Sequence, residues 1–140
     1  MNDCIPTVLY VEDNPNDRLL VTVAFRNADI LVHLHVVENG EQAIDYLAGN
    51  GVYARREDHP FPKLVLLDLK LPRQSGLEVL KWIRNQDSLK GLQVVVLSSS
   101  ARTDDMDQAL RLGASAYYAK PVSLEPLREM IMEISSKWLA

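Results

Sequence analysis

Three acidic residues and one lysine stand at the ends of short apolar segments in this chain. Glu12 and Asp13 follow the apolar run that begins at Thr7, Asp68 follows "LVLL", and Lys120 follows "SAYYA". Three carboxylates within about 4 Å of one another repel by several kcal/mol even at an effective dielectric near 20, so they must protonate, separate or bind a cation. If folding brings these side chains together, a bound divalent cation is the simplest solution.

The types of these residues favour magnesium and phosphoryl chemistry. Carboxylate oxygens prefer hard cations, and a small cluster with room for water suits Mg²⁺ better than a full Ca²⁺ cage. Asp68 would then act as a nucleophile toward a phosphoryl group, with Lys120 and the metal ion offsetting charge and the Ser98 hydroxyl as a donor. A phosphoryl group adds about two negative charges and three strong acceptors, so the same chemistry suits a switch as well as an enzyme.

Alternating strand and helix patterns must position these groups. Short β-rich or apolar runs predict strands, and apolar residues at helical spacing predict helices. The predicted strands cover residues 7–13, 33–38, 63–68, 92–100 and 115–119, and the predicted helices cover residues 14–29, 40–49, 75–86, 103–113 and 123–138. Residues 50–62 hold two prolines, a glycine and mixed charges without an apolar period, which predicts a surface excursion.

Five successive strand and helix units predict an α/β fold with a five-stranded parallel sheet and helices on both faces. Because both faces are covered, uninterrupted apolar strands such as "LVLL" and "VVVL" are expected. Sheets of this class bind ligands beyond the carboxyl ends of their strands, at a topological switch point. The acidic residues, Ser98 and Lys120 are therefore predicted to meet at one edge of the sheet.

Composition narrows the classes of function. The 140 residues, 47% apolar and 24% charged, suit one globular domain. The single cysteine, Cys4, cannot form an internal disulfide, and no Cys or His cluster has zinc spacing. The net charge of −4 speaks against a nucleic-acid surface, and no apolar run reaches the roughly 18 residues of a membrane helix. We expect a cytoplasmic protein without direct contact to nucleic acid or membrane.

Taken together, the motifs resemble the receiver domain of two-component response regulators, which has the flavodoxin-like, CheY-like fold. The resemblance covers about residues 6–138 and rests on "VEDN", "LLDLKLPRQSG", "VVVLSSSA" and "AYYAKP". The interval from Asp68 to Ser98 is 30 positions and that from Asp68 to Lys120 is 52, and both match the intervals usual in the family. A single receiver domain over residues 1–140, with no output domain, is expected.

The resemblance implies a role for each acidic residue. Asp68 would accept the phosphoryl group from a histidine kinase. Asp13 and Asp68, with Glu12 through water and the backbone carbonyl of Lys70, would hold Mg²⁺. Glu12 stands where many receivers have aspartate, which keeps the charge and lengthens the reach. The Lys70 side chain lies two positions past the acceptor, where it would compete for the phosphoryl group or hinder attacking water.

The resemblance also implies the parts of a switch. Ser98 and Lys120 would bind the phosphoryl oxygens, and Tyr117 would change rotamer when Ser98 moves. Ser98 replaces the threonine that is commoner in the family. Lys120-Pro121 would be a cis peptide, which a proline permits at small cost. Tyr117 and Tyr118 are expected on opposite faces of their strand.

A narrower resemblance is to the small single-domain regulators paired with cyanobacterial phytochromes. It rests on the long excursion, "DLKLP" and "AYYAKPV", and it implies a phytochrome-type histidine kinase as partner and a homodimer. The last helix carries an apolar stripe that would pack on the sheet, and three further apolar residues, Met130, Met132 and Leu139, lie off this stripe. They are either scattered surface residues or part of a dimer interface with the helix at 103–113 and the strand at 115–119.

Two other readings of the residues stay open. A phosphohydrolase of the haloacid dehalogenase type also uses an aspartate after a parallel strand, but it needs a second aspartate where this chain has Lys70. A receiver-like module that works by protein contact without phosphorylation usually lacks part of the acid, acceptor and lysine set, which is complete here. We therefore expect a signalling protein whose only intrinsic reaction is autodephosphorylation. The downstream protein is not indicated. His33 and His35 share a strand face without a visible third metal ligand, which favours a role as structural or surface residues.

Overall fold

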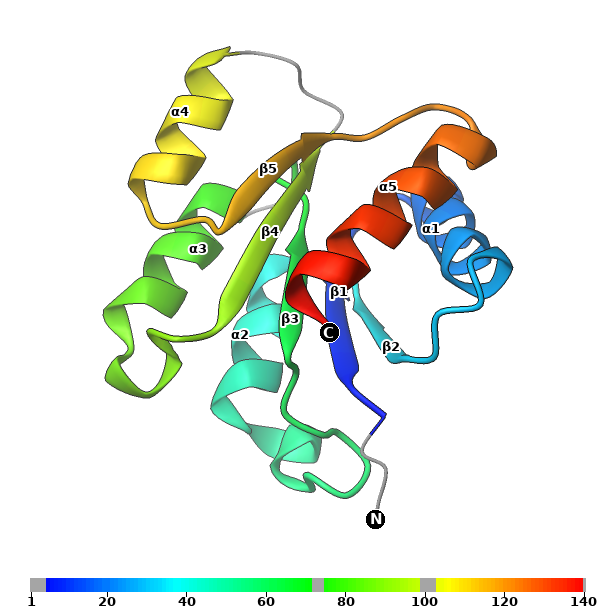
Figure 1. Ribbon diagram of the computed structural model, residues 1–140. Coiled ribbons are helices and arrows are strands. Elements are labelled where there is room, and N and C mark those ends of the chain that lie inside the picture. Colours follow the sequence, from blue (N-terminus) through cyan, green and yellow to red (C-terminus); the bar gives the residue numbers. More distant parts are fainter. Residues whose placement is uncertain (1–4, 72–74, 99–102, 140) are drawn as a thin grey trace.

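Strands and helices alternate along the chain in the predicted order (Figure 1). The computed structural model describes residues 5–71, 75–98 and 103–139, so Cys4 and the predicted strand residues 99 and 100 lie outside the described residues. The strands are β1 (Thr7–Val11), β2 (His33–Val37), β3 (Leu64–Leu67), β4 (Gln93–Ser98) and β5 (Ala116–Ala119). The helices are α1 (Pro15–Asn27), α2 (Gly40–Ala48), α3 (Gly76–Asn85), α4 (Thr103–Arg111) and α5 (Leu124–Trp138), with short 3₁₀ turns η1 (Gly51–Ala54) and η2 (Asp87–Leu89).

The five strands form one parallel sheet in the order β2-β1-β3-β4-β5. Helices α1 and α5 cover one face, and α2, α3 and α4 cover the other (Figure 1). The chain adds β2 on one side of β1 and β3 on the other, so the switch point lies between β1 and β3. The predicted fold class is confirmed.

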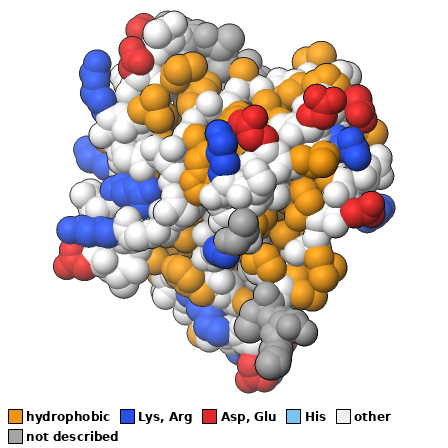
Figure 2. All heavy atoms as spheres, in the orientation of Figure 1, with side chains coloured by type: hydrophobic (Ala, Val, Ile, Leu, Met, Phe, Trp, Pro, Cys, Tyr) orange, Lys and Arg blue, Asp and Glu red, His pale blue; other side chains and the backbone are white. Residues whose placement is uncertain are grey.

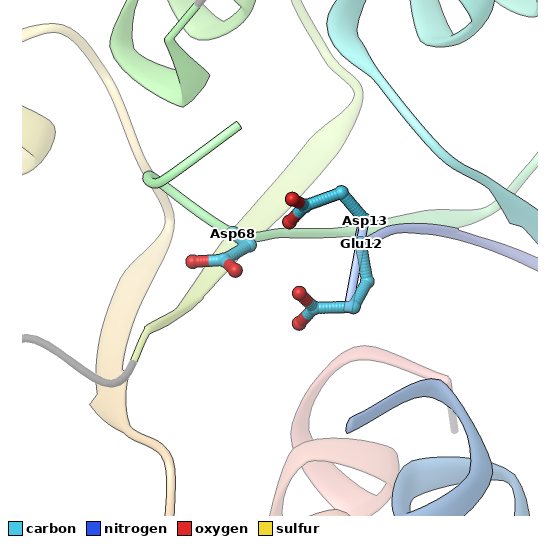
Figure 3. Close-up of side chains that lie close together, drawn as sticks. All are labelled: Glu12, Asp13 and Asp68. Carbon is cyan, nitrogen blue, oxygen red and sulfur yellow. The ribbon is translucent and has the colours of Figure 1, made fainter. Parts of the chain in front are cut away.

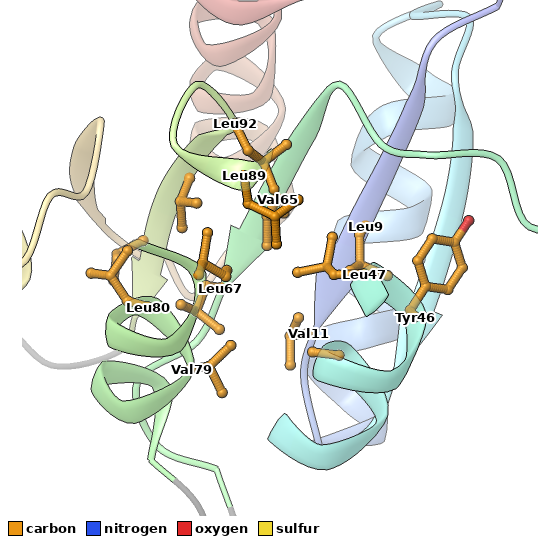
Figure 4. Close-up of a cluster of buried hydrophobic side chains, with 14 of the residues drawn as sticks. Leu9, Val11, Tyr46, Leu47, Val65, Leu67, Val79, Leu80, Leu89 and Leu92 are labelled. Atoms are coloured by element: carbon orange, nitrogen blue, oxygen red, sulfur yellow. The ribbon is translucent and has the colours of Figure 1, made fainter. Parts of the chain in front are cut away.

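Two apolar layers hold the sheet between its helices. Figure 4 shows the layer on the α2 and α3 side, where Leu9 of β1 lies beside Leu47 of α2 and Leu67 of β3 lies beside Leu80 of α3. All four residues of β3 are buried, which explains its uninterrupted apolar sequence. Burial of a leucine or valine side chain contributes about 1.5–3 kcal/mol relative to exposure, so these strands fix the sheet in place.

No helix in the described part of the chain is long and apolar enough to span a membrane.

Local signals set the helix ends next to the sheet edge. The Asn14 side chain accepts hydrogen bonds from the backbone N–H groups of Asn16 (2.9 Å) and Asp17 (3.1 Å), and Pro15 occupies the first turn, so the predicted Asn-Pro start is confirmed. Helix α2 ends at Gly49, whose φ of 73° is the left-handed conformation that glycine adopts freely. These caps fix where each helix leaves or approaches the edge of the sheet.

Gly76 allows α3 to begin directly against the backbone of the acceptor segment. A Cβ atom at this position would lie 2.2 Å from the carbonyl oxygen of Asp68 and 2.7 Å from the Cα atom of Leu69. The Gly76 N–H donates to the Leu69 carbonyl at 3.0 Å. The Ser75 side chain and Glu78 form a capping box that starts the same helix. Asp68 is thus held between the end of β3 and the first turn of α3.

The predicted surface excursion is anchored by an arginine. Arg56 donates from its guanidinium to the carbonyls of Tyr46 (2.8 Å) and Leu47 (3.1 Å) at the end of α2, where a basic group also complements the helix dipole. The His35 ring packs against the rings of Tyr46 and His59, with centroids 5.1 and 5.4 Å apart. His35 is therefore part of a ring cluster that ties the excursion to β2 and α2.

The apolar stripe of α5 packs on the sheet as predicted. Leu127, Ile131 and Ile134 are buried, and the two outer residues of the stripe pack against the same cluster. Met130 and Leu139, which lie off the stripe, pack there too. Met130 and Leu139 are therefore partly buried, whereas Met132, the third off-stripe apolar residue, is exposed.

Candidate functional site

Three carboxylates converge at the carboxyl edge of the sheet, on either side of the switch point. Glu12 and Asp13 follow β1, Asp68 follows β3, and the parallel register pairs the residues just before them, Val11 and Leu67. One ligand oxygen from each of the three side chains lies within 4.8 Å of the others (Figure 3). Within residues 5–71, 75–98 and 103–139, no other trio of His, Cys, Asp or Glu meets this criterion. The predicted convergence is confirmed.

The three carboxylates differ in exposure. Glu12 is fully buried and Asp68 is 4% exposed, whereas Asp13 is exposed. Figure 3 shows Glu12 and Asp13 extending to different sides of the chain, as adjacent residues of an extended segment do. The cluster therefore has a buried base and an open side, which fits a hard cation that keeps several of its waters.

Lys120 places a buried ammonium in this cluster. Its side chain is 4% exposed, and Nζ donates to Glu12 Oε1 at 2.5 Å and to Asp17 Oδ2 at 2.8 Å. The nearest oxygen of Asp68 lies 3.7 Å away. Burial alone would lower the pKa of Lys120, but the bonds to Asp17 and Glu12 and the charge of Asp68 raise it above its usual value. The ammonium is therefore charged at neutral pH.

The surroundings of Asp68 disfavour the ionised form of its carboxyl group. Burial first, and then the adjacent Glu12, raise its pKa from 3.8 to a net value of about 7. The charge of Lys120 and the Lys70 N–H, which donates to Asp68 Oδ1 at 3.2 Å, act in the opposite direction without cancelling it. One ammonium thus does not balance two buried carboxylates, and a further cation at this position would favour the ionised form of Asp68.

Several neighbours hold Glu12 in place. The Tyr10 hydroxyl donates to Glu12 Oε1 at 3.0 Å, and the Asn14 N–H donates to Oε2 at 3.3 Å. Burial and the charge of Glu12 raise the pKa of Tyr10, so it remains a neutral donor. Arg18 Nη1 donates to the carbonyls of Glu12 (3.1 Å) and Asp13 (2.9 Å), which fixes the backbone between β1 and α1.

Sequence reasoning missed Tyr10, Asp17 and Arg18 as site residues. The sequence does hold a signal for Tyr10, because residues two apart on a strand face the same side and Glu12 is two positions on. Asp17 and Arg18 give no comparable signal. They occupy the first turns of α1, where polar side chains are ordinary, and only the packing of that helix brings them to the site.

Ser98 and Tyr117 lie where the switch was predicted. Ser98 is buried at the end of β4, and its carbonyl accepts a hydrogen bond from the Lys120 N–H at 2.7 Å. Tyr117 packs against the cluster on the α2, α3 and α4 side. Tyr118 packs on the opposite face and donates to Glu133 Oε2 at 2.8 Å. The expected opposite orientation of the two tyrosines is confirmed.

The expected cis peptide between Lys120 and Pro121 is wrong. This bond is trans, since none of the described residues is joined by a cis peptide bond. The two isomers of an X-Pro bond differ by only about 0.5–1 kcal/mol in an unconstrained chain, so the sequence itself does not choose between them. The trans bond leaves Lys120 in contact with the carboxylates.

With this geometry established, comparison with known proteins assigns the family. The chain matches the response regulator receiver domain model over residues 8–132. The protein belongs to the response regulator receiver family. Proteins of this family are generally signalling modules without enzymatic output, and their receiver domains bind a divalent metal ion.

Relatives of known name cover nearly the whole chain. Response regulator Rcp1 of Synechocystis is 36% identical over 132 residues, which are 94% of this chain and 88% of Rcp1. The probable methanogenesis regulatory protein FilR2 of Methanothrix harundinacea is 35% identical over 135 residues, 94% of this chain and 83% of FilR2. The family therefore includes relatives of similar identity whose names refer to different roles.

Solved structures agree with the fold. RPA3017, a response regulator in red light signalling of R. palustris, has a TM-score of 0.92 at 36% identity, with 96% of this chain and 94% of that chain covered. The phosphorylated cyanobacterial phytochrome response regulator RcpA has a TM-score of 0.89 at 34% identity, with 98% and 96% covered. The Mn²⁺-bound form of Rcp1 has a TM-score of 0.84 at 36% identity, with 96% and 94% covered. The predicted resemblance to regulators of cyanobacterial phytochromes is confirmed.

We predict that Asp68→Asn stabilises the metal-free protein above neutral pH. Because the folded-state pKa of Asp68 is about 7 and its ordinary value is 3.8, the folded protein retains a proton that the unfolded chain releases. The native protein therefore loses stability as the pH rises from about 4 to 7, and this loss is complete above the folded pKa. The amide avoids it, and the expected gain in free energy of unfolding is on the order of 1–4 kcal/mol at pH 8.

Urea unfolding in the presence of a chelator, at pH 5 and pH 8, measures this gain. Asp58→Asn is the matched control because Asp58 is an exposed carboxylate that pairs with Arg55 at the surface. It should change the stability by less than about 0.5 kcal/mol at either pH. Equal stability of native protein and Asp68→Asn at pH 8 would show that the buried carboxylate carries no penalty.

Proposed function

We propose that this protein is a phospho-accepting response regulator that receives a phosphoryl group on Asp68 from a histidine kinase. The observation that carries the proposal is the position of Asp68, a nearly buried carboxyl group beside two other carboxylates and 3.7 Å from a buried ammonium. Membership of the receiver family supports it, and so does the relative RcpA, which is described in its phosphorylated form.

In the proposed reaction, an oxygen of the ionised Asp68 attacks phosphorus, in line with the bond to the donor. The P–N bond of the donor phosphohistidine breaks, and its electron pair stays on the imidazole nitrogen. Lys120 offsets charge on the phosphoryl oxygens, and the Ser98 hydroxyl donates a hydrogen bond to one of them. The same aspartyl phosphate is later hydrolysed by water, which is the only intrinsic reaction that we assign to the protein.

The donor set fits Mg²⁺ as the resident cation. Asp13 and Asp68 would bind it directly, Glu12 through water, and Lys70 through its backbone carbonyl. When bound, Mg²⁺ offsets the charge of the carboxylates and of the phosphoryl oxygens. The acidic cluster with its open side supports this assignment, and the relative Rcp1 is described in a Mn²⁺-bound form.

The switch is proposed to run from Ser98 to Tyr117. Once Ser98 moves toward a phosphoryl oxygen, it leaves space near the end of β4, and the Tyr117 ring turns inward to fill it. Tyr117 is only partly buried at rest, and its strand pairs with β4, so both residues belong to one unit of the sheet. The ring movement would change the surface of β5.

The proposed kinase partner is of the phytochrome type. The relatives RPA3017 and RcpA support it, because their descriptions place them in red light signalling and with a cyanobacterial phytochrome. FilR2, with similar identity, belongs to methanogenesis regulation. Apolar side chains for docking a protein near the acceptor are available, since Leu19 on α1 and Val122 after Lys120 are exposed. We propose a cytoplasmic location, where such kinases present their phosphohistidine.

Homodimerisation is proposed through the face formed by α4, β5 and α5. Strand β5 is an edge of the sheet, and the helices before and after it in the chain carry exposed apolar residues, Met106 and Leu110 on α4 and Met132 on α5. Figure 2 shows hydrophobic side chains over α4 and along α5 with charged groups among them. A dimer through this face would bury an exposed sheet edge and couple assembly to Tyr117.

The two alternative functions have less support. A phosphohydrolase of the haloacid dehalogenase type would need a carboxylic acid where Lys70 stands. A module that works without phosphorylation would not need the complete set of Asp13, Asp68 and Lys120. The downstream target can be a separate protein, a second copy of this chain, or the kinase itself when the regulator acts as a phosphate sink.

Intact-protein mass after incubation with acetyl phosphate and Mg²⁺ tests the acceptor. The native protein and Asp58→Asn should gain the mass of one phosphoryl group, and the gain should disappear with a chelator or in Asp68→Asn. If the native protein binds the metal ion but its mass does not change, phosphorylation fails at its first step, and the phosphorylation-independent module becomes the better interpretation.

Light scattering tests the dimer face. We expect a dimer mass for the native protein in at least one phosphorylation state, because the exposed apolar residues of α4 and α5 are then covered. Leu110→Asp should weaken the dimer at least about tenfold by placing a charge in the interface. Leu31→Asp, a change at an exposed leucine between α1 and β2, should leave it intact. Loss of the dimer with both variants, or with neither, would contradict this assignment.

A further inference from the structure

Lys120 is shared among three carboxylates, and the acceptor is the most distant of them. Nζ lies 2.5 Å from Glu12 Oε1, 2.8 Å from Asp17 Oδ2 and 3.7 Å from Asp68 Oδ2. Lys120 therefore forms hydrogen bonds with Glu12 and Asp17, whereas the distance to Asp68 is too long for a hydrogen bond. Two of the three ammonium donors are therefore engaged away from the residue that would carry the phosphoryl group.

The two carboxylates that hold the ammonium differ in how readily they could release it. The Glu12 side chain is 1% exposed and also accepts bonds from the Tyr10 hydroxyl and the Asn14 N–H. The Asp17 side chain is 35% exposed and lies in the first turn of α1. Asp17 can be rehydrated at little cost when the ion pair breaks, whereas Glu12 cannot.

A phosphoryl group on Asp68 would compete for the same ammonium. Its oxygens carry about two negative charges and form strong bonds to a lysine donor. When Lys120 turns toward the phosphoryl oxygens, it can keep its bond to the buried Glu12, and the bond to the more exposed Asp17 is the one most readily given up or weakened. The negative charge of Asp17 also opposes the approach of a second anion at this side of the site.

We propose that Asp17 is a positioning residue that holds Lys120 in its resting place and releases it when the phosphoryl group arrives. This inference rests on the proposed function, because it concerns how Lys120 changes its bonding partner from Asp17 to the phosphorylated Asp68. Asp17 thereby weakens the binding of a phosphoryl group and sets the balance between the resting and the phosphorylated arrangement.

A structural role for Asp17 would look different. An acidic residue in the first turn of a helix stabilises that helix through its dipole, and its loss lowers stability by a few tenths to 1 kcal/mol. Such a role would not change the affinity of the site for a phosphoryl group. Glu41 is the matched control, because it is an exposed acidic residue in the first turn of α2.

Titration with beryllium fluoride, a non-covalent mimic of the phosphoryl group on a carboxylate, tests the proposal in the presence of Mg²⁺. Asp17→Asn should bind the mimic about three- to tenfold more tightly than the native protein at low salt. The difference should shrink at 1 M salt, where screening reaches about 3 Å. Glu41→Gln should match the native affinity.

A measurement on the native protein completes the test. The ¹³C resonance of the Asp17 carboxylate should shift when the mimic saturates the site, because the bond to Lys120 is lost, whereas that of Glu41 should not. A stationary Asp17 resonance, or equal or weaker binding by Asp17→Asn while the native protein binds, would overturn the role of Asp17 alone. If the native protein does not bind the mimic, the proposed function itself fails.

Discussion

The structure at the carboxyl edge of the sheet depends on the balance of charge around one buried ammonium. Glu12 and Asp68 are both buried, and among the described residues Lys120 supplies the single cation in direct contact with them. The raised pKa of Asp68 shows that this balance is incomplete. A site with excess negative charge attracts a metal ion and repels an anionic phosphoryl group until such an ion is present. The dependence of the proposed phosphorylation on Mg²⁺ follows from this electrostatic requirement.

Most of the fold could be predicted because its signals are local. Uninterrupted apolar runs such as that of β3 require burial on both faces, and the Asn-Pro start of α1 and the glycine after α2 mark helix ends within a few residues. The anchoring of residues 50–62 could not be predicted, because it depends on Arg56 reaching the carbonyls of Tyr46 and Leu47. A contact between segments that are separate in the sequence has no local pattern.

The site was predictable where the sheet alone determines position. Asp13, Asp68 and Lys120 each follow a strand, and parallel strands bring their carboxyl ends to one edge. Asp17 reaches the same edge from a helix, and its contact with Lys120 depends on how α1 packs against α5 and the sheet, which has no signature in the sequence spacing. The trans bond before Pro121 was mispredicted for a related reason, because tertiary context selects between isomers of similar energy.

The central claim is that the raised pKa of Asp68 couples its ionisation to the binding of a cation. Calorimetric titration with Mg²⁺ at pH 7, in two buffers of different ionisation enthalpy, tests this claim most directly. With the pKa of Asp68 at about 7, binding to the native protein should release about half a proton at this pH and almost none at pH 9. Asp68→Asn should release almost none at pH 7. Metal binding by the native protein without proton release at pH 7 would contradict this view of the site, because Asp68 would then already be ionised.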